Sequence, residues 1–201
     1  MDAFLAALSV VLAYLIGSIP SAYILLRLAK GIDIRNVGTG NVGALNTFHQ
    51  IGPAGAAFVL FADVSKSVIV VLLPSWIEAP DWVRYVSAFS VVAGHNWPVF
   101  LGFRGGKGAA TTLGVGLGLA PVLASISFAP VILSVVAIRN VVIGVAGAFV
   151  LFNVLTIATS ESWALIGTGL GLTVLVVGNY KARTIQGVAK AVRERKWRAV
   201  A

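Results

Sequence analysis

Long apolar blocks, separated by short polar connectors, set the pattern of this 201-residue chain. The first block, residues 3–28, contains a single charge, Arg27, and is long enough to cross a bilayer, because a transmembrane helix needs about 20 apolar residues. Further blocks follow at residues 51–73, 82–101, 109–120, 122–138, 141–159 and 163–180. The pattern predicts an all-α protein, with one integral membrane domain over residues 1–180 and about seven transmembrane helices.

The stretch 109–138 leaves the number of crossings open. As one helix it would be about 45 Å long, well beyond the hydrocarbon thickness of about 30 Å. Pro121 and Pro130 also disfavour a continuous helix. Two spans hinged near Pro121 give seven crossings, and one long kinked span gives six.

Composition excludes several classes of protein. Hydrophobic residues make up 58% of the chain and charged residues only 11%, whereas soluble domains carry about 25% charged residues. A cleaved signal peptide would begin with basic residues, but the first charge is Asp2. Cysteine is absent, which excludes disulfides, thiolate metal sites and cysteine nucleophiles. With only two histidines, far apart, we expect no metal and no cofactor.

The charges divide between the two ends of the predicted spans. The net charge is +8, and the bases follow alternate spans: Arg27, Lys30, Arg35, Arg104, Lys107, Arg139 and seven residues from Lys181 onward. The opposite ends carry Asp2, Glu78, Asp81 and Glu161, with Arg84 as the exception. The positive-inside rule then predicts an outer N-terminus and a cytoplasmic C-terminus.

Residues 181–201 form a basic tail. We expect an amphipathic cytoplasmic helix on anionic headgroups, with a frayed solvated tail as the alternative. The expected partner is therefore the lipid bilayer and not nucleic acid. A monomer satisfies all of these patterns.

The loop "RNVGTGNVGALN" contains the G-x-G-x-x-G spacing of a dinucleotide-binding turn. That fingerprint must follow a β-strand in a βαβ unit, and here a membrane span precedes it. Its local chemistry still favours an anion, because glycines turn amides outward and polar side chains add donors. The candidate phosphate ligands are Arg35, Gly38, Thr39, Gly40, Asn41 and Asn46.

A second loop, "GHNWPVFLGFRGGKGAATT", carries half of a P-loop. Because Gly108 follows the lysine and supplies no hydroxyl for magnesium, a nucleotide triphosphatase is not expected. The residues still suit a phosphate cradle at a helix start: Arg104, Gly105, Gly106, Lys107 and Gly108. His95 is either a core histidine or part of this site.

Asp63 and Lys66 lie within a span, three residues apart on one helical face. Charges at that depth usually pair or serve a site. We interpret them as a structural ion pair that orients the bundle. A position near the middle of the membrane should be remote from the inner loops, so no direct chemistry is expected of them.

Four segments together resemble a known family: "GSIPSAY", "GIDIRNVGTGNVGALN", "DVSK" and "GHNWPVFLGFRGGKGAAT". The chain is similar to the bacterial membrane acyl-phosphate:glycerol-3-phosphate acyltransferases. The resemblance implies a seven-span fold in the bacterial cell membrane with the active site facing the cytoplasm. It also implies transfer of a fatty acyl group from acyl phosphate to the 1-hydroxyl of glycerol 3-phosphate, which gives lysophosphatidic acid and phosphate in the first step of phospholipid synthesis.

The sequence departs from the family pattern in two places. In the first loop Thr39 stands for a serine and Leu45 for a threonine. At the end of the last span, "GNYKARTIQG" replaces a motif that typically contains His-Arg-x-Asn. Lys181 and Arg183 keep its positive charge, and we assign them to substrate binding.

These observations predict direct attack by the glycerol hydroxyl on the acyl carbonyl, without a covalent intermediate. Lys107 and the loop amides would stabilise the developing charge. The base would be His95 or a phosphate oxygen of a substrate. Two alternatives have different signatures: an organophosphate transporter would move its ligand unchanged, and a non-catalytic paralogue would bind acyl phosphate without turnover.

Overall fold

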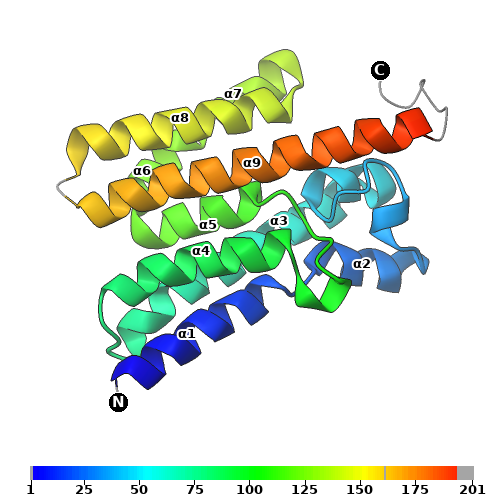
Figure 1. Ribbon diagram of the computed structural model, residues 1–201. Coiled ribbons are helices and arrows are strands. Elements are labelled where there is room, and N and C mark those ends of the chain that lie inside the picture. The colour runs from blue at the N-terminus through cyan, green and yellow to red at the C-terminus, as the bar shows by residue number, and fades with distance from the viewer. Residues whose placement is uncertain (1, 161, 194–201) are drawn as a thin grey trace.

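The computed structural model describes residues 2–160 and 162–193, and over these ranges all regular secondary structure is helical. The α-helices are α1 (Asp2–Gly17), α2 (Ser21–Lys30), α3 (Ala44–Trp76), α4 (Trp82–Asn96), α5 (Ala109–Leu119), α6 (Pro121–Ser127), α7 (Ala129–Ile138), α8 (Val141–Thr159) and α9 (Trp163–Arg193), with the 3₁₀ turns η1 (Ile34–Asn36) and η2 (Val99–Leu101). The long helices run side by side in one bundle (Figure 1). The predicted all-α class is confirmed.

Four segments are long and apolar enough to cross a membrane: Ala3–Lys30, Ala44–Trp76, Val141–Thr159 and Trp163–Ile185. Two shorter apolar segments, Ala109–Leu119 and Pro121–Ala137, lie between the second and third of them. The protein is therefore an integral membrane protein. The number of seven crossings and the orientation of the termini stay predictions.

Prolines break two of the predicted spans. Pro121 begins α6, which puts the hinge where the sequence predicts it, and a second break at Phe128 precedes α7. The first span is also interrupted, because helix α1 ends at Gly17 and α2 begins only at Ser21, after Pro20. A proline lacks the N–H that would continue the preceding helix.

Two hydrophobic clusters form the core. The larger joins α1, α3, α4, α5 and α9 through Ala13, Val70, Val71, Ala88, Val91, Val92, Val115, Leu172 and Val176. The smaller lies under the loop end of the bundle and joins Leu26, Ile34, Val42, Val59 and Leu101. Helices α1 and α4 are in close contact at Gly94. A Cβ atom added there would clash with the backbone oxygen of Tyr14, so only glycine fits. The end of α4 that carries His95 is therefore held firmly.

Helix α9 continues without a break past residue 180 to Arg193. The predicted boundary between a membrane domain and a tail at residues 180 and 181 is thus not a helix end. Residues 194–201 lie outside the described residues, and the amphipathic tail stays a prediction.

Candidate active site

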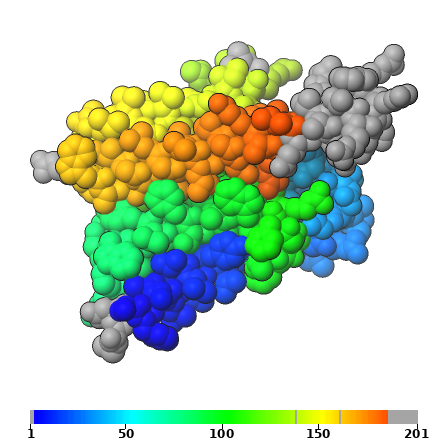
Figure 2. All heavy atoms as spheres, viewed as in Figure 1, coloured from blue at the N-terminus to red at the C-terminus, as the bar shows by residue number. Residues whose placement is uncertain are grey.

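The two glycine-rich loops lie against each other at one end of the bundle. Arg35 Nη1 in the first loop donates to Leu101 O in the second at 2.9 Å. Val42 of the first loop and Gly105 of the second line the same small cavity, beside His95. Figure 2 shows the second loop, in green, meeting the cyan start of α3 on the molecular surface.

Asn46 organises the first loop from inside. Its side chain is fully buried. It forms hydrogen bonds of 3.1–3.2 Å with backbone groups of Ile34, Val37, Thr39 and Asn41. The structure therefore corrects the prediction that Asn46 binds substrate, because the loop itself occupies its donors and acceptor.

Gly38 and Gly40 give the first loop its shape. Their φ angles are 57° and 67°, a left-handed conformation that glycine adopts without steric cost. The amide of Gly40 donates to Val37 O at 3.0 Å. Gly40 thus closes a turn inside the loop, and its amide is not turned toward an anion as the sequence predicts.

Arg35 holds the first loop to its surroundings. Its guanidinium contacts the Asp33 carboxylate at 2.7 Å and lies over the Tyr23 ring, 5.5 Å from the centroid. The side-chain hydrogen bond to Arg35 lowers the pKa of Asp33 below its ordinary value. The fork predicted to bind phosphate is engaged by Asp33 and by Leu101 O, so we correct its role to a tie between the two loops.

Thr39 and Asn41 are the side chains of the first loop that remain for a ligand. Thr39 is exposed, and its Oγ1 accepts a 3.4 Å bond from the Asn41 amide. The Oδ1 atom of Asn41 is buried and has no hydrogen-bond partner among the described residues. The assignment of these two residues to substrate binding stays a prediction.

The amides of Gly105 and Gly106 are used inside the protein. Gly106 N donates to His95 O at 2.9 Å, and Gly105 N donates to Asn96 O at 3.3 Å. A Cβ on Gly106 would collide with the His95 imidazole, and one on Gly105 with Pro98. The prediction that these amides hold phosphate is wrong: the glycines allow the loop to pack against the end of α4.

The start of α5 is the better anion site. Its first amides have no acceptor within the helix, and the helix dipole makes this end positive. Gly108 caps the helix with φ 93°, and Asn96 Oδ1 lies beside it. Asn96 is fully buried, yet both of its amide atoms are without a hydrogen-bond partner in the described part of the chain. Sequence reasoning missed Asn96, although it follows His95 directly.

Helix α9 closes the site from the other side. Arg183 Nη2 donates to Asn96 O at 2.8 Å, and Arg183 Nε donates to Asn179 Oδ1 at 3.2 Å. Asn179 Nδ2 in turn donates to Gly106 O at 3.1 Å. Lys181, predicted to act with Arg183, is exposed. Because two of its donors are engaged inside the protein, the substrate-binding role of Arg183 stays a prediction. Asn179 within "GNYKARTIQG" is a further residue that the sequence did not single out.

Lys107 lies between the second loop and α9. Its Nζ is 4.2 Å from the centroid of the Tyr180 ring, a cation–π contact. Burial and, secondarily, the nearby charge of Arg183 lower the pKa of Lys107. Arg104, three residues earlier, is exposed on the same loop. The arrangement concentrates positive charge beside the start of α5.

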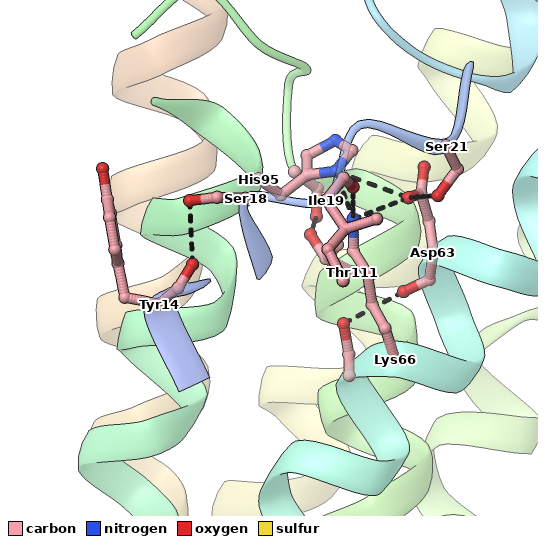
Figure 3. Close-up of polar contacts among 10 residues, drawn as sticks. Tyr14, Ser18, Ile19, Ser21, Asp63, Lys66, His95 and Thr111 are labelled. Atoms are coloured by element: carbon pink, nitrogen blue, oxygen red, sulfur yellow. Dashed lines mark hydrogen bonds and ion pairs between the residues drawn. The ribbon is translucent and has the colours of Figure 1, made fainter. Parts of the chain in front are cut away.

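Asp63, Lys66 and His95 form a buried polar cluster (Figure 3). Lys66 Nζ lies 2.8 Å from Asp63 Oδ1 and 3.3 Å from His95 Nδ1. The predicted ion pair is present, but the prediction that it is remote from the loops is wrong, since His95 packs against Gly106. The position of Asp63 along its span did not predict this proximity. The end of α4, which carries His95, packs beside Asp63 and connects it to the second loop.

Among the residues that the structure describes, no three histidine or acidic side chains gather as metal ligands. The apolar bundle is that of an integral membrane protein, and Lys107 and Arg183 lie together at its loop end.

A family profile for "Glycerol-3-phosphate acyltransferase" matches residues 7–190. Since this is most of the chain, the protein belongs to that family, as the resemblance predicts. The acyltransferase of Clostridioides difficile is 34% identical over 98% of this chain and 100% of its own length. That of Thermoanaerobacter pseudethanolicus is 44% identical over 74% and 76%. Glycerol-3-phosphate acyltransferase 4 of Dehalococcoides mccartyi is 50% identical over 57% of this chain, which spans about half (49%) of that relative.

Two crystal structures share the fold. Both are of PlsY (YgiH), an integral membrane glycerol 3-phosphate acyltransferase. The glycerol 3-phosphate form has a TM-score of 0.82 at 30% identity, covering 94% of this chain and 93% of its own. The lysophosphatidic acid form has a TM-score of 0.79 at 29% identity.

Proposed function

We propose that the protein transfers a fatty acyl group from acyl phosphate to the 1-hydroxyl of glycerol 3-phosphate. The products are lysophosphatidic acid and phosphate. The proposal rests mainly on the start of α5. The first amides of this helix are free, Lys107 precedes it in the chain, and the unpartnered side-chain amide of Asn96 lies beside it. Family membership and the glycerol 3-phosphate form of the related structure support the choice of acceptor.

Charge complementarity supports the binding step. Both substrates carry phosphate, and helix amides and bases are preferred ligands for it. Lys107 and Arg183 approach from the second loop and from α9, while the nearest buried acid, Asp63, is already paired with Lys66. Thr39 and Asn41 face the same end from the first loop. The site can therefore hold two phosphate-bearing molecules close together, which favours reaction by proximity.

Once both substrates are held close together, the reaction requires only stabilisation of the developing charge and an acceptor for the hydroxyl proton. The glycerol oxygen forms a bond to the acyl carbon, and the bond from that carbon to the phosphate oxygen breaks. Lys107 and the α5 amides stabilise charge on the carbonyl oxygen and on the leaving phosphate. The hydroxyl proton passes to His95 or to a phosphate oxygen.

The hydrogen bonds among Ser21, Asp63 and His95 favour direct attack by the glycerol hydroxyl, without a covalent intermediate on the protein. These are the residue types of a hydrolase triad, but Ser21 Oγ donates to Asp63 Oδ1 at 3.1 Å and not to the imidazole. A nucleophilic serine requires a base that removes its proton. The Ser21 hydroxyl instead donates its hydrogen bond to the Asp63 carboxylate, which is paired with Lys66.

The same geometry supports a cytoplasmic active site in a bacterial cell membrane. Arg35, Lys107 and Arg183 lie at the loop end of the bundle, whereas Glu78 and Asp81 lie at the opposite end of α3. Bases gather on the cytoplasmic side of membrane proteins.

The test is an acylation assay with purified protein in lipid vesicles. We expect labelled glycerol 3-phosphate to give lysophosphatidic acid with acyl phosphate and little product with acyl thioesters. Preference for thioesters would overturn the donor assignment. Movement of glycerol 3-phosphate across the vesicle without acylation would indicate a transporter, and binding of acyl phosphate without product would indicate a non-catalytic paralogue.

A further inference from the structure

Two sequence motifs to which the proposed reaction gives no role, "GSIPSAY" and "DVSK", meet at His95 (Figure 3). We propose that Lys66, Asp63 and the carbonyl of Ile19 hold His95 as a neutral imidazole with its hydrogen on Nε2. His95 then serves the reaction as a hydrogen-bond donor and not as its base. Lys66 and Asp63 are positioning residues in this arrangement. Donation to substrate rests on the proposed function, whereas the tautomer does not.

The donors of Lys66 fix the hydrogen on the ring. An ammonium group has three N–H donors and no acceptor. Around Lys66 Nζ lie three acceptors: Asp63 Oδ1 at 2.8 Å, Ile19 O at 3.0 Å and His95 Nδ1 at 3.3 Å. Because Lys66 can only donate, the contact with His95 requires an unprotonated Nδ1. A neutral imidazole then carries its hydrogen on Nε2.

The break between α1 and α2 supplies one of these acceptors. Pro20 lacks an N–H, and the chain between Gly17 and Ser21 leaves the helical path. Ile19 O is thereby turned toward Lys66. Ser21 begins α2 and donates to Asp63 Oδ1 at 3.1 Å, so the carboxylate is fixed from both sides. This gives Pro20 and Ser21 of the motif a physical role.

The other face of the imidazole points to the reaction site. A Cβ at Gly106 would collide with His95 Nε2, so this nitrogen lies directly beside the second loop. Asn179 binds the carbonyl of the same glycine at 3.1 Å. No hydrogen bond among the described residues uses His95 Nε2 itself. Its hydrogen is thus available to a substrate oxygen next to Lys107.

The cations around the ring oppose a second proton, whereas the Asp63 carboxylate, 3.7 Å from Nδ1, favours one. Asp63 and Lys66 face it from α3, and Arg183 of α9 binds the neighbouring Asn96 O. A proton on Nδ1 would displace the hydrogen bond from Lys66 and bring two cations to 3.3 Å. His95 would have to accept a proton on Nε2 to act as the base, but that nitrogen already carries one.

The tautomer is measured directly by nitrogen NMR of protein labelled with [¹⁵N]histidine, with His49→Gln used to assign the two rings. We expect an unprotonated Nδ1 and a protonated Nε2 for His95 at neutral pH. A protonated Nδ1 in the wild-type protein, with or without a second proton, would overturn the proposal. This readout does not require catalytic activity, so failure of the proposed function leaves it intact.

Lys66→Met tests the control of the tautomer. Without the ammonium, Asp63 Oδ1, 3.7 Å from His95 Nδ1, becomes the best partner of that nitrogen. We expect the hydrogen to move to Nδ1. If the unpaired carboxylate prevents folding, the double variant Asp63→Asn and Lys66→Met removes both charges and should lose the fixed tautomer. A wild-type spectrum in either folded variant would overturn the role of Lys66.

The donor role is tested by His95→Gln against His95→Leu. The amide nitrogen of glutamine can replace Nε2–H but cannot act as a base. We expect His95→Leu to lower kcat about 100-fold or more, as for other lost transition-state donors, and His95→Gln to restore most of it. Arg84→Gln, at the far end of the same helix, controls for the effect of a substitution in α4. A glutamine variant as slow as the leucine variant would overturn donation.

Discussion

Two buried asparagines, one at each glycine-rich loop, use their side chains in opposite ways. Asn46 and Asn96 are both completely buried. Asn46 bonds four backbone groups of the first loop, whereas both amide atoms of Asn96 are unpartnered among the described residues. A buried polar group without a partner costs free energy. The proposed function therefore assigns the free amide of Asn96 to a ligand, whereas Asn46 stabilises its own loop.

The comparison extends to the charged residues. Arg35 beside Asn46 is paired with Asp33. Lys107 of the second loop lies over the Tyr180 ring, and burial and Arg183 lower its pKa. It forms no ion pair with an acid in the part of the chain that the structure describes. Two loops of similar composition thus differ in their contacts, and we propose that the second loop carries the main anion site.

Lys107→Ala should give the largest effect, because it removes the cation from the second loop. We expect kcat to fall about 100- to 1,000-fold with little change in melting temperature. The control is Arg27→Gln, which removes one exposed charge at the same end of the bundle. Turnover within a few-fold of wild type would remove Lys107 from the reaction.

Asn46→Leu and Asn96→Leu test directly whether the two buried asparagines have different roles, since leucine has a similar size but forms no side-chain hydrogen bonds. For Asn46→Leu we expect a loss of several kcal/mol of stability, because about three to four hydrogen bonds are lost in the interior. For Asn96→Leu we expect equal or higher thermal stability and a 10- to 100-fold lower kcat/KM, roughly the value of one hydrogen bond to a charged group. Thermal unfolding in detergent and the acylation assay measure both.

The reverse result would be informative. An Asn96→Leu protein that unfolds early but turns over normally would make Asn96 a structural residue, and the contrast between the two loops would disappear.

The alkaline limb of the pH profile tests Lys107 further. Its pKa is lowered from the ordinary 10.5, and the active form is the cation. Activity should therefore fall as pH rises through a value below 10.5, and the limb should move to higher pH in Lys107→Arg, because arginine stays protonated. An unmoved limb would assign it to another group.

Sequence reasoning located both loops and the Asp63–Lys66 pair, because glycine spacing and charges within an apolar span are visible along the chain. It could not tell which donors are free. In the sequence Gly105 and Gly106 are typical anion ligands. In the fold their amides instead donate hydrogen bonds to carbonyls at the end of α4. Such pairings join residues through the fold, so spacing alone does not reveal them.

The break at Pro20 shows a second limit. The residue is plain in the sequence, but apolar neighbours on both sides made residues 3–28 look like one span. Pro20 accounts for the break, and the fold shows what the break provides, which is the Ile19 carbonyl as an acceptor for Lys66. Asn179 was missed for a related reason, since its role depends on α9 crossing the second loop.

Thr39→Ala should have the smallest effect and addresses what remains of the first loop as a binding element. Its hydroxyl is exposed and makes one long 3.4 Å contact with the Asn41 amide. Losing it should raise KM for glycerol 3-phosphate by about 3- to 10-fold, the value of one ordinary hydrogen bond, with kcat nearly constant. Initial rates at varied acceptor and saturating acyl phosphate measure this. Thr184→Ala, on an exposed turn of α9, is the matched control. If KM does not change, the first loop is only a frame, and the acceptor must be held by α5 and α9 alone.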